Sequence, residues 1–316
     1  MTQIIKWTEI EEILPGIDVI SEIEKGFVAY SEGKVVVPPV GELLFEDPPG
    51  DTHIKYGYIK EDNYFVIKIA SGFYKNPELG LSSSRGVNLL FSAGTGVLEA
   101  VLLDEGNLTN IRTAAAGACI AKYLAPSKVE NVGILGAGIQ GRLQLEYLLQ
   151  VISPEKVYVY DQLPESIDSY KHYFELFPIS INFAEPAGIA AKCNYIVTAT
   201  PSETPLLQAG DIRRGTHITA VGSDTPEKQE LDSGIIGKAD LVVADSFPQC
   251  QTRGEIFHAL KNNQIRIEHL VELGNVISGK SRGRENDNQV TVADLTGVAV
   301  QDIQISKAVF SHFRNN

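Results

Sequence analysis

The sequence has little of what disulfide-bonded, metal-binding or membrane-spanning proteins need. Its 316 residues include three cysteines and six histidines. Cys119, Cys193 and Cys250 are odd in number and widely spaced, which excludes a disulfide framework and a CxxC metal site, so we expect buried thiols. The histidines form no HxH or HxxxH pair, and we therefore expect no metal site. Nowhere do about 18 apolar residues follow one another, as a membrane helix would require.

Positive charge is also scarce. Lys and Arg number 27 against 40 Asp and Glu, which gives a formal charge of −13. This balance repels phosphate backbones and anionic membranes, so nucleic acid and membranes are poor candidates as partners. Acidic residues interrupt residues 1–20 where a signal peptide would need an apolar core, and we expect a cytoplasmic protein. The hydrophobic content of 43% is enough for one large or two ordinary globular domains.

The first third of the chain predicts an α+β arrangement. Residues 17–30 place Ile20, Ile23 and Phe27 three or four positions apart, as one face of a helix requires. Short strand-like runs separated by Pro and Gly turns follow this helix. They indicate an antiparallel sheet or a partial barrel, with strands at 34–37, 53–59, 64–70, 87–92 and 98–103.

From about Asn110 the pattern alternates between helix and strand, which predicts a parallel, doubly wound sheet. An Ala-rich helix at 113–124 stops before Pro126, and a second helix is expected at 141–151. A strand at 289–295 and a closing helix at 302–313 end the chain. The other predicted strands are 131–135, 156–160, 195–198, 217–221 and 241–244.

The strand at 131–135 runs directly into the sequence GAGIQG and then into a helix. In such a strand–GxGxxG–helix unit, Gly136 makes the tight turn, Gly138 admits the pyrophosphate and Gly141 lets helix and strand pack closely. The phosphates would lie at the helix N-terminus beside Ile139 and Gln140. The competing interpretation is a glycine-rich turn without a ligand.

Asp161 ends the next strand, twenty residues after Gly141. A carboxylate there would accept hydrogen bonds from the ribose hydroxyls and repel a 2′-phosphate, which favours NAD(H) over NADP(H). A solvated loop acid is the alternative.

Two further loops follow predicted strands at the edge where doubly wound sheets bind ligands. The first contains Thr200 and Pro201, and the second contains Ser223 and Asp224. Thr200, Pro201 and Ser223 are therefore candidate cofactor-binding residues. The first loop has the alternative of being only a connection that caps a helix.

Four segments together resemble the ornithine cyclodeaminase/mu-crystallin family over nearly the whole chain. They are EAVLLDEGNLTNIRTAAAGACIAKYLA, VGILGAGIQGRLQLEYL, VGSDTPEKQELD and VTVADLTGVAVQD. Within the family, the branch for ectoine utilisation and imino-acid reduction is the most similar, by FVIKIASGFYKNPELGL, GSDTPEKQEL, FPQCQTRGE and VELGNVISGKSRGR.

The resemblance implies an α/β architecture. A doubly wound, Rossmann-type NAD-binding domain, residues 122–299, would be inserted into a discontinuous α+β domain, residues 1–121 and 300–316. The outer domain would bind substrate and form a homodimer.

Two enzyme activities are compatible with the resemblance. The first is NAD(H)-dependent hydride transfer to or from Cα of a small amino acid or imine, as in imino-acid or ketimine reductases and amino-acid dehydrogenases. The second is a cyclodeaminase that uses bound NAD catalytically and releases ammonia. A non-catalytic, crystallin-like nucleotide-binding protein is the third interpretation.

The resemblance also implies the substrate-site residues. Lys68 would touch the substrate carboxylate and the reacting centre, and a lysine in so apolar a strand is costly without an anion. Arg112 would bind the same carboxylate through its guanidinium fork. The alternatives are an edge-strand lysine whose amine reaches solvent, and an ion pair of Arg112 with an acid such as Asp104.

Two more residues acquire roles by resemblance. Asp224 matches the acid that transfers protons and directs water in cyclodeaminase members, although amino-acid dehydrogenases of the family keep it as well. Its alternative is a loop cap. Thr113 is expected to cap the Ala-rich helix and to face the cofactor.

The sequence departs from the family pattern in one stretch. Many members place a carboxylate-binding arginine shortly after the early proline, but residues 38–42 read PPVGE. Carboxylate recognition then depends on Lys68 and Arg112, with Lys55 or Arg85 as possible helpers. For the distal ammonium of ornithine, only Glu42 and Glu46 are candidates.

Overall fold

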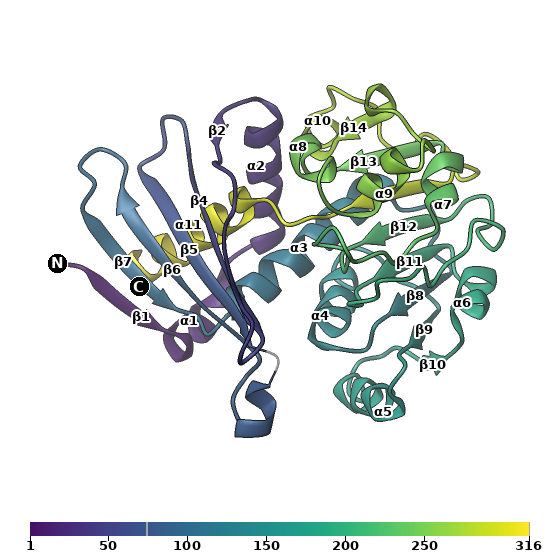
Figure 1. The fold of residues 1–316 in the computed structure, drawn as a ribbon, viewed down its shortest axis with the longest axis horizontal. Coiled ribbons are helices and arrows are strands. Elements are labelled where there is room, and N and C mark those ends of the chain that lie inside the picture. The colour runs from purple at the N-terminus through teal and green to yellow at the C-terminus, as the bar shows by residue number, and fades with distance from the viewer. Residues whose placement is uncertain (74, 316) are drawn as a thin grey trace. The chain divides into compact units, whose positions relative to one another are not determined.

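The computed structural model describes residues 1–73 and 75–315 and divides into two compact units (Figure 1). The first unit contains residues 1–112 and 299–316, and the second contains residues 113–298. The sequence-based division at 121/122 and the observed one at 112/113 both fall inside one helix, α3 (Asn107–Leu124). Among the described residues, no helix combines the length and the apolar character that crossing a membrane requires.

A mixed sheet forms the centre of the first unit, in the order β1-β7-β6-β5-β4-β2, with β3 also pairing to β4. Its long strands are antiparallel as predicted, whereas β1 joins β7 in parallel. The strands are β1 (Gln3–Lys6), β2 (Val35–Val36), β3 (Gly41–Phe45), β4 (Gly50–Ile59), β5 (Tyr64–Phe73), β6 (Ser84–Ser92) and β7 (Leu98–Leu103). The sequence analysis missed β1 and β3.

One long helix packs on this sheet and a second packs against that helix. α2 (Val19–Ser31) begins at Asp18, whose side chain accepts a hydrogen bond from the Ser21 N–H, and it contacts α11 (Ala299–Asn315). α11 also contacts β4 and β5, so the end of the chain completes the first unit. The smaller elements are α1 (Trp7–Ile13), η1 (Leu14–Gly16) and η2 (Asn76–Leu79).

The second unit is built on a parallel sheet, which confirms the predicted α/β class. Within the described residues its strand order is β10-β9-β8-β11-β12-β15-β13-β14, and every pairing is parallel. The strands are β8 (Asn131–Leu135), β9 (Lys156–Tyr160), β10 (Ile181–Phe183), β11 (Tyr195–Thr198), β12 (His217–Ala220), β13 (Leu241–Ala244), β14 (Leu270–Glu272) and β15 (Thr291–Asp294).

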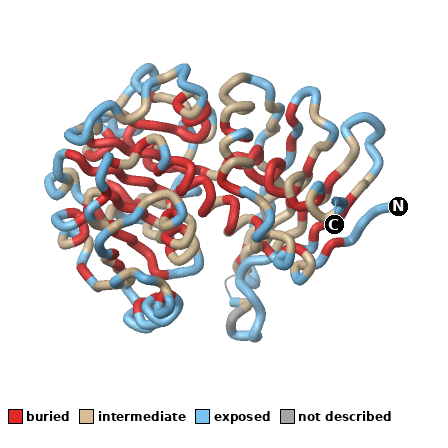
Figure 2. Tube along the Cα trace, turned by 180° about the vertical axis from the view of Figure 1, so that it is seen from behind, coloured by how far each residue is buried: buried red, intermediate tan, exposed pale blue. Residues whose placement is uncertain are grey.

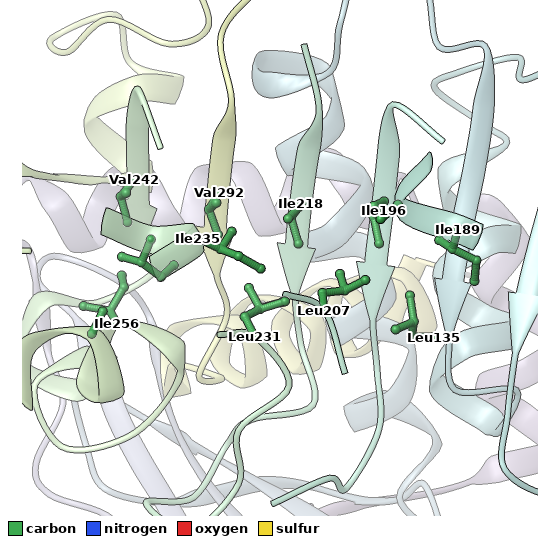
Figure 3. Packing of buried hydrophobic residues seen from close by; sticks show 14 of the residues in the cluster. Leu135, Ile189, Ile196, Leu207, Ile218, Leu231, Ile235, Val242, Ile256 and Val292 are labelled. Carbon is green, nitrogen blue, oxygen red and sulfur yellow. The ribbon is translucent and has the colours of Figure 1, made fainter. Parts of the chain in front are cut away.

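Short helices connect these strands and cover the sheet. They are α4 (Ile139–Leu148), α5 (Pro164–Tyr173), α6 (Pro186–Lys192), α7 (Ser233–Lys238), α8 (Phe247–Cys250), α9 (Glu255–Lys261), η3 (Ile267–His269) and α10 (Leu273–Ile277). A continuous apolar core packs between strand residues such as Ile196, Ile218 and Val292 and helix residues such as Ile189 and Ile235 (Figure 3). Figure 2 shows that buried residues, in red, gather in the interior of this unit and that exposed residues, in pale blue, gather in its outer turns.

The strand order defines the place where this sheet can bind a ligand. From β8 the chain moves outward through β9 and β10, and then returns to the other side of β8 with β11. Ligands of doubly wound sheets bind at the carboxyl ends of the strands where the order reverses. Here that point is the end of β8 and β11, and the Ala199 N–H indeed donates to the Leu135 carbonyl there.

Candidate active site

The glycine loop has the geometry that its sequence predicts. Gly136 has φ +103°, and a Cβ there would lie 2.5 Å from the Ala199 carbonyl oxygen. A Cβ at Gly141 would lie 1.8 Å from the Gly136 carbonyl oxygen, whereas one at Gly138 would meet nothing within 4 Å. Gly136 and Gly141 are therefore required by packing, and Gly138 leaves open space for a ligand at the start of α4.

The first turn of α4 carries the other two residues of the loop. Ile139 begins the helix and is exposed, and Gln140 is half-buried. Gly138 is the N-cap and supplies no side-chain acceptor for the N–H groups of this turn. The helix dipole makes such a terminus suited to an anion.

Asp161 follows β9 and contacts the glycine loop through hydrogen bonds. Its Oδ2 accepts a hydrogen bond of 2.8 Å from the Ala137 N–H, and its Oδ1 accepts one of 3.0 Å from the Leu163 N–H. Asp161 thus has a structural role in the loop beside the predicted contact with a ribose. It also lines a cavity of about 350 Å³ together with Gly136, Gly138, Tyr160, Gln162, Leu163, Ala199, Thr200, Pro201, Ser202 and Leu206.

The loops after β11 and β12 approach the same edge. Pro201 is exposed on the cavity wall, and Thr200 donates both its N–H and its hydroxyl to Glu230. Residues 199–216, which are all described and connect β11 to β12, contain no helix, so this loop does not cap one. Ser223 is buried and donates its hydroxyl to the Lys228 carbonyl.

Asp224 lies in the loop after β12. Its side chain is 56% exposed, and the Lys228 ammonium donates to its Oδ1 at 2.7 Å. Its own N–H donates to the Gly222 carbonyl, which fixes the turn. The carboxylate is thus held by one partner and stays accessible to solvent.

The prediction that Thr113 caps the Ala-rich helix is wrong. α3 begins at Asn107, six residues earlier than predicted, because Asp104 accepts a hydrogen bond of 3.0 Å from the Leu108 N–H in its first turn. Thr113 therefore lies inside α3. Its carbonyl accepts a hydrogen bond of 3.0 Å from the Gln144 side chain on α4.

In the first unit, the structure brings Lys68 and Arg112 together on a third residue that the sequence analysis missed. Asp302 on α11 accepts from the Lys68 ammonium at 3.1 Å and from Arg112 Nε at 3.0 Å, both through Oδ1. The neighbouring Gln301 accepts a bond of 2.9 Å from Arg112 Nη1. All four side chains are buried. We call these residues, Lys68, Arg112, Gln301 and Asp302, the cationic cluster.

The burial of the cationic cluster changes its titration. Burial lowers the pKa of Lys68 below its usual range, and the Asp302 carboxylate opposes this effect. Burial alone would raise the pKa of Asp302, but Arg112 and Lys68 hold that pKa below its ordinary value. Two cations and one anion leave the cluster with one excess positive charge when all three are ionised.

The structure contradicts the alternative for Lys68 and agrees with the one for Arg112. Lys68 is 3% exposed on β5, which lies between β4 and β6, so it is not an edge-strand lysine that reaches solvent. Arg112 does form a buried ion pair with an acid, although that acid is Asp302 and not Asp104. Asp104 instead accepts from the Asn88 amide at 3.2 Å and caps α3.

The weaker candidates lie in different places. Lys55 is opposite Lys68 in the β4–β5 register, close enough for its charge to lower the pKa of Asp302. Arg85 is exposed on β6. Glu42 on β3 is 3.7 Å from His53 Nδ1, and Glu46 is exposed just beyond this strand.

The whole chain matches one family model. The chain belongs to the ornithine cyclodeaminase/mu-crystallin family, whose model covers residues 1–316. Its homologues carry the names cyclodeaminase, alanine dehydrogenase and imino-acid reductase.

Three relatives illustrate the range of activities after which members of the family are named. An uncharacterised cyclodeaminase of Sinorhizobium fredii is 39% identical over 308 residues, covering 96% of this chain and 93% of the relative. The structure of an archaeal alanine dehydrogenase dimer with bound NAD is 33% identical, with a TM-score of 0.91 over 99% of this chain and 96% of the other. The Δ1-pyrroline-2-carboxylate reductase of Thermococcus litoralis, in complex with NADH and L-proline, is 28% identical, with a TM-score of 0.92 over 99% and 98%.

Proposed function

We propose that this protein is an NAD(H)-dependent oxidoreductase that transfers a hydride to or from Cα of a small amino acid or imine. The observation that carries the proposal is the cationic cluster, in which Lys68 and Arg112 share the single carboxylate of Asp302. When all three groups are ionised, one positive charge is left to attract a substrate carboxylate. The glycine loop supplies the second requirement, an anion-binding helix terminus beside an open cavity. When bound, the nicotinamide would supply or accept the hydride.

The protein groups have separate tasks in this reaction. Arg112 and Lys68 bind the substrate carboxylate and orient Cα. Asp224, accessible in its loop, exchanges a proton with the substrate nitrogen or with water. Thr113 is the first residue of the second unit, and we propose that it lies beside the cofactor.

A cyclodeaminase that recycles bound NAD and releases ammonia is the second candidate. The similarity to the Sinorhizobium fredii cyclodeaminase favours it. Both activities need a carboxylate anchor, a cofactor and an acid, so the cationic cluster and the glycine loop serve either. The two differ in whether NADH is consumed.

A substrate panel separates the candidates by nicotinamide absorbance with ammonia assayed in parallel. The panel is ornithine, lysine, alanine and aspartate with NAD, then pyrroline-2-carboxylate and keto acids plus ammonia with NADH. We expect a stoichiometric change in NADH with at least one pair. Ammonia release from ornithine at constant absorbance would instead establish the cyclodeaminase, and NADH binding without turnover would indicate a non-catalytic nucleotide-binding protein.

Asp161 is proposed to select NAD(H) over NADP(H). Because Asp161 also holds the loop through Ala137 and Leu163, Asp161→Ala should weaken the binding of both nucleotides. Removal of the charge should in addition raise the affinity for NADPH relative to NADH, by roughly tenfold for the loss of about 1.4 kcal/mol of repulsion. Fluorescence titration measures the ratio of dissociation constants, and an unchanged ratio would remove Asp161 from the ribose site.

Asp224→Asn tests the proton-transfer role. We expect turnover to fall by roughly two orders of magnitude, as loss of a general acid or base typically causes, with NADH affinity unchanged. Lys228→Met is the matched control, because it removes the ion-pair partner of Asp224 and leaves the carboxylate. Equal losses in both variants would show that only the ion pair matters.

We propose that the second subunit of the homodimer binds the face of the mixed sheet opposite to the one that contacts α11. On β5, Val66 and Lys68 are buried, whereas the residues that alternate with them point to the other face of the sheet and are partly exposed. Tyr56 and Tyr58 are 38% and 41% exposed, and Phe65 stacks on Phe91 at 4.8 Å beside them. An apolar sheet face of this kind marks an interaction surface. The archaeal alanine dehydrogenase is itself a dimer.

Light scattering should give twice the chain mass, and a monomer at micromolar concentration would contradict the proposed homodimer.

A further inference from the structure

A buried carboxylate behind the proposed nucleotide cavity holds the loops that form it. Glu230 follows β12 in the segment before α7 and is 0% exposed. Its Oε2 accepts from the Thr198 hydroxyl at 2.7 Å and from the Gly222 N–H at 2.9 Å. Its Oε1 accepts from the Thr200 N–H at 2.6 Å and from the Thr200 hydroxyl at 2.7 Å. Four donors therefore occupy both oxygens.

These donors belong to the end of β11 and to the two loops that follow β11 and β12. The loops also touch through their backbones, since a Cβ at Gly222 would lie 2.2 Å from the Thr200 carbonyl oxygen. On the other side, the Gly136 turn lies against Ala199 in the same way. Three successive strand-end loops are thus packed together, and Glu230 ties two of them to one point.

The segment that carries Glu230 is itself fixed by a second buried acid. The Glu230 N–H donates to Glu255 Oε1 at 2.7 Å, and the Leu231 N–H donates to Glu255 Oε2 at 3.1 Å. The Glu230 carbonyl accepts from the Leu206 N–H at 2.7 Å. The backbone of Glu230 is therefore held on both sides. Its carboxylate has a fixed position, at which it binds the two loops.

We propose that Glu230 is a positioning residue of the NAD(H) site, which holds Thr200 and the Gly222 loop where the nucleotide binds. This inference rests on the proposed function. Glu230 itself does not line the cavity, whereas Thr200, Pro201 and Ser202 do. It acts through the loop, because a shift of the Thr200 backbone would move one wall of the cavity.

The hydrogen bonds of Glu230 make the substitution Glu230→Gln a specific test of its positioning role. Each oxygen of Glu230 accepts one backbone N–H, from Thr200 or from Gly222, and a backbone N–H cannot reverse its role. In either orientation, the side-chain NH₂ of Glu230→Gln would face one of these donors. One loop must then move away, although size and shape are retained. Thr198→Val is the matched control, since it removes one hydroxyl donor from β11 and keeps both loop contacts.

The experiment measures NADH affinity by fluorescence titration of the full-length wild type and both variants. We expect Glu230→Gln to weaken NADH binding roughly 10- to 100-fold, corresponding to one unsatisfied buried donor, and Thr198→Val to change it less than about threefold. In the enzyme assay the KM for NADH should rise by the same factor, while kcat at saturating NADH changes little. A purely structural role would lower the melting temperature and leave this KM unchanged.

The outcomes separate the inference from the function on which it rests. A wild type that does not bind NADH overturns the proposed function. A wild type that binds, with a folded Glu230→Gln of equal affinity, overturns only the role of Glu230. If Glu230→Gln does not fold, Glu230→Asp is measured, because it keeps the charge but is one methylene too short to reach both loops. Unchanged affinity in Glu230→Asp, or failure of both variants to fold, assigns Glu230 to the fold alone.

Discussion

Replacing Lys68 with methionine is expected to reduce kcat/KM roughly a thousandfold. The change keeps the side-chain volume but removes one of two buried cations, so Arg112 and Asp302 remain as a neutral pair. The excess positive charge that binds the substrate carboxylate is then lost. A hydrogen bond to a charged group contributes about 1.5–3 kcal/mol, and misplacement of Cα adds to the barrier. Steady-state kinetics with the substrate identified by the panel measures the effect.

NADH binding provides the control for this variant. Lys68 lies in the first unit, while the proposed nucleotide site is built from the second, so the NADH dissociation constant should stay within about twofold of wild type. A methionine variant with wild-type kcat/KM would remove Lys68 from the substrate site. It would also contradict the assignment of the excess charge to carboxylate binding.

Asp302→Ala is expected to lower the free energy of unfolding by about 3–5 kcal/mol, because two buried cations lose the carboxylate that they share. For a protein of this size the melting temperature should fall by roughly 10 °C. Thermal unfolding followed by circular dichroism measures the change. Asp224→Ala is the exposed counterpart, and loss of its surface pair with Lys228 should cost less than about 1 kcal/mol.

A double variant checks the electrostatic cause. Asp302→Asn keeps an acceptor but removes the charge, so it should also destabilise the protein. Adding Lys68→Met to Asp302→Asn should recover part of the loss, because one buried cation leaves with the anion. If the double variant is less stable than Asp302→Asn by the full effect of Lys68→Met, the coupling is absent and packing explains the loss.

The sequence predicted the parallel sheet better than the mixed one, for a physical reason. β8, β11 and β13 have the predicted bounds, because strands buried on both faces are short, unbroken apolar runs. β9 also has the predicted bounds, and its residues alternate in burial, whereas the three-residue strands β10 and β14 were missed. β1 is only four residues long and is stabilised by pairing with distant β7. The start of α3 was missed because Asp104, a capping residue, precedes a polar first turn that has no clear helical period.

The same distinction applies to the candidate site. The glycine loop is a local motif, so its residues could be found from spacing alone. Asp302 could not, since its partners are 190 and 234 residues away in the chain. Glu230 lies in the polar run EKQELD, where an acid is typical of solvent exposure. Its burial depends on which loops pack around it, and that is a property of the assembled sheet.

The chain order sets the time at which the cationic cluster can form. Synthesis proceeds from the N-terminus, so Lys68 and Arg112 leave the ribosome long before Asp302, which lies on the last helix. Until α11 is complete, the nascent mixed sheet has two cations to bury and no carboxylate from α11 to receive them. The parallel sheet meets no such delay, because all its strands end by Asp294. The inserted unit is therefore able to fold while the outer one is still being translated, and the outer unit is completed only when α11 has been synthesised.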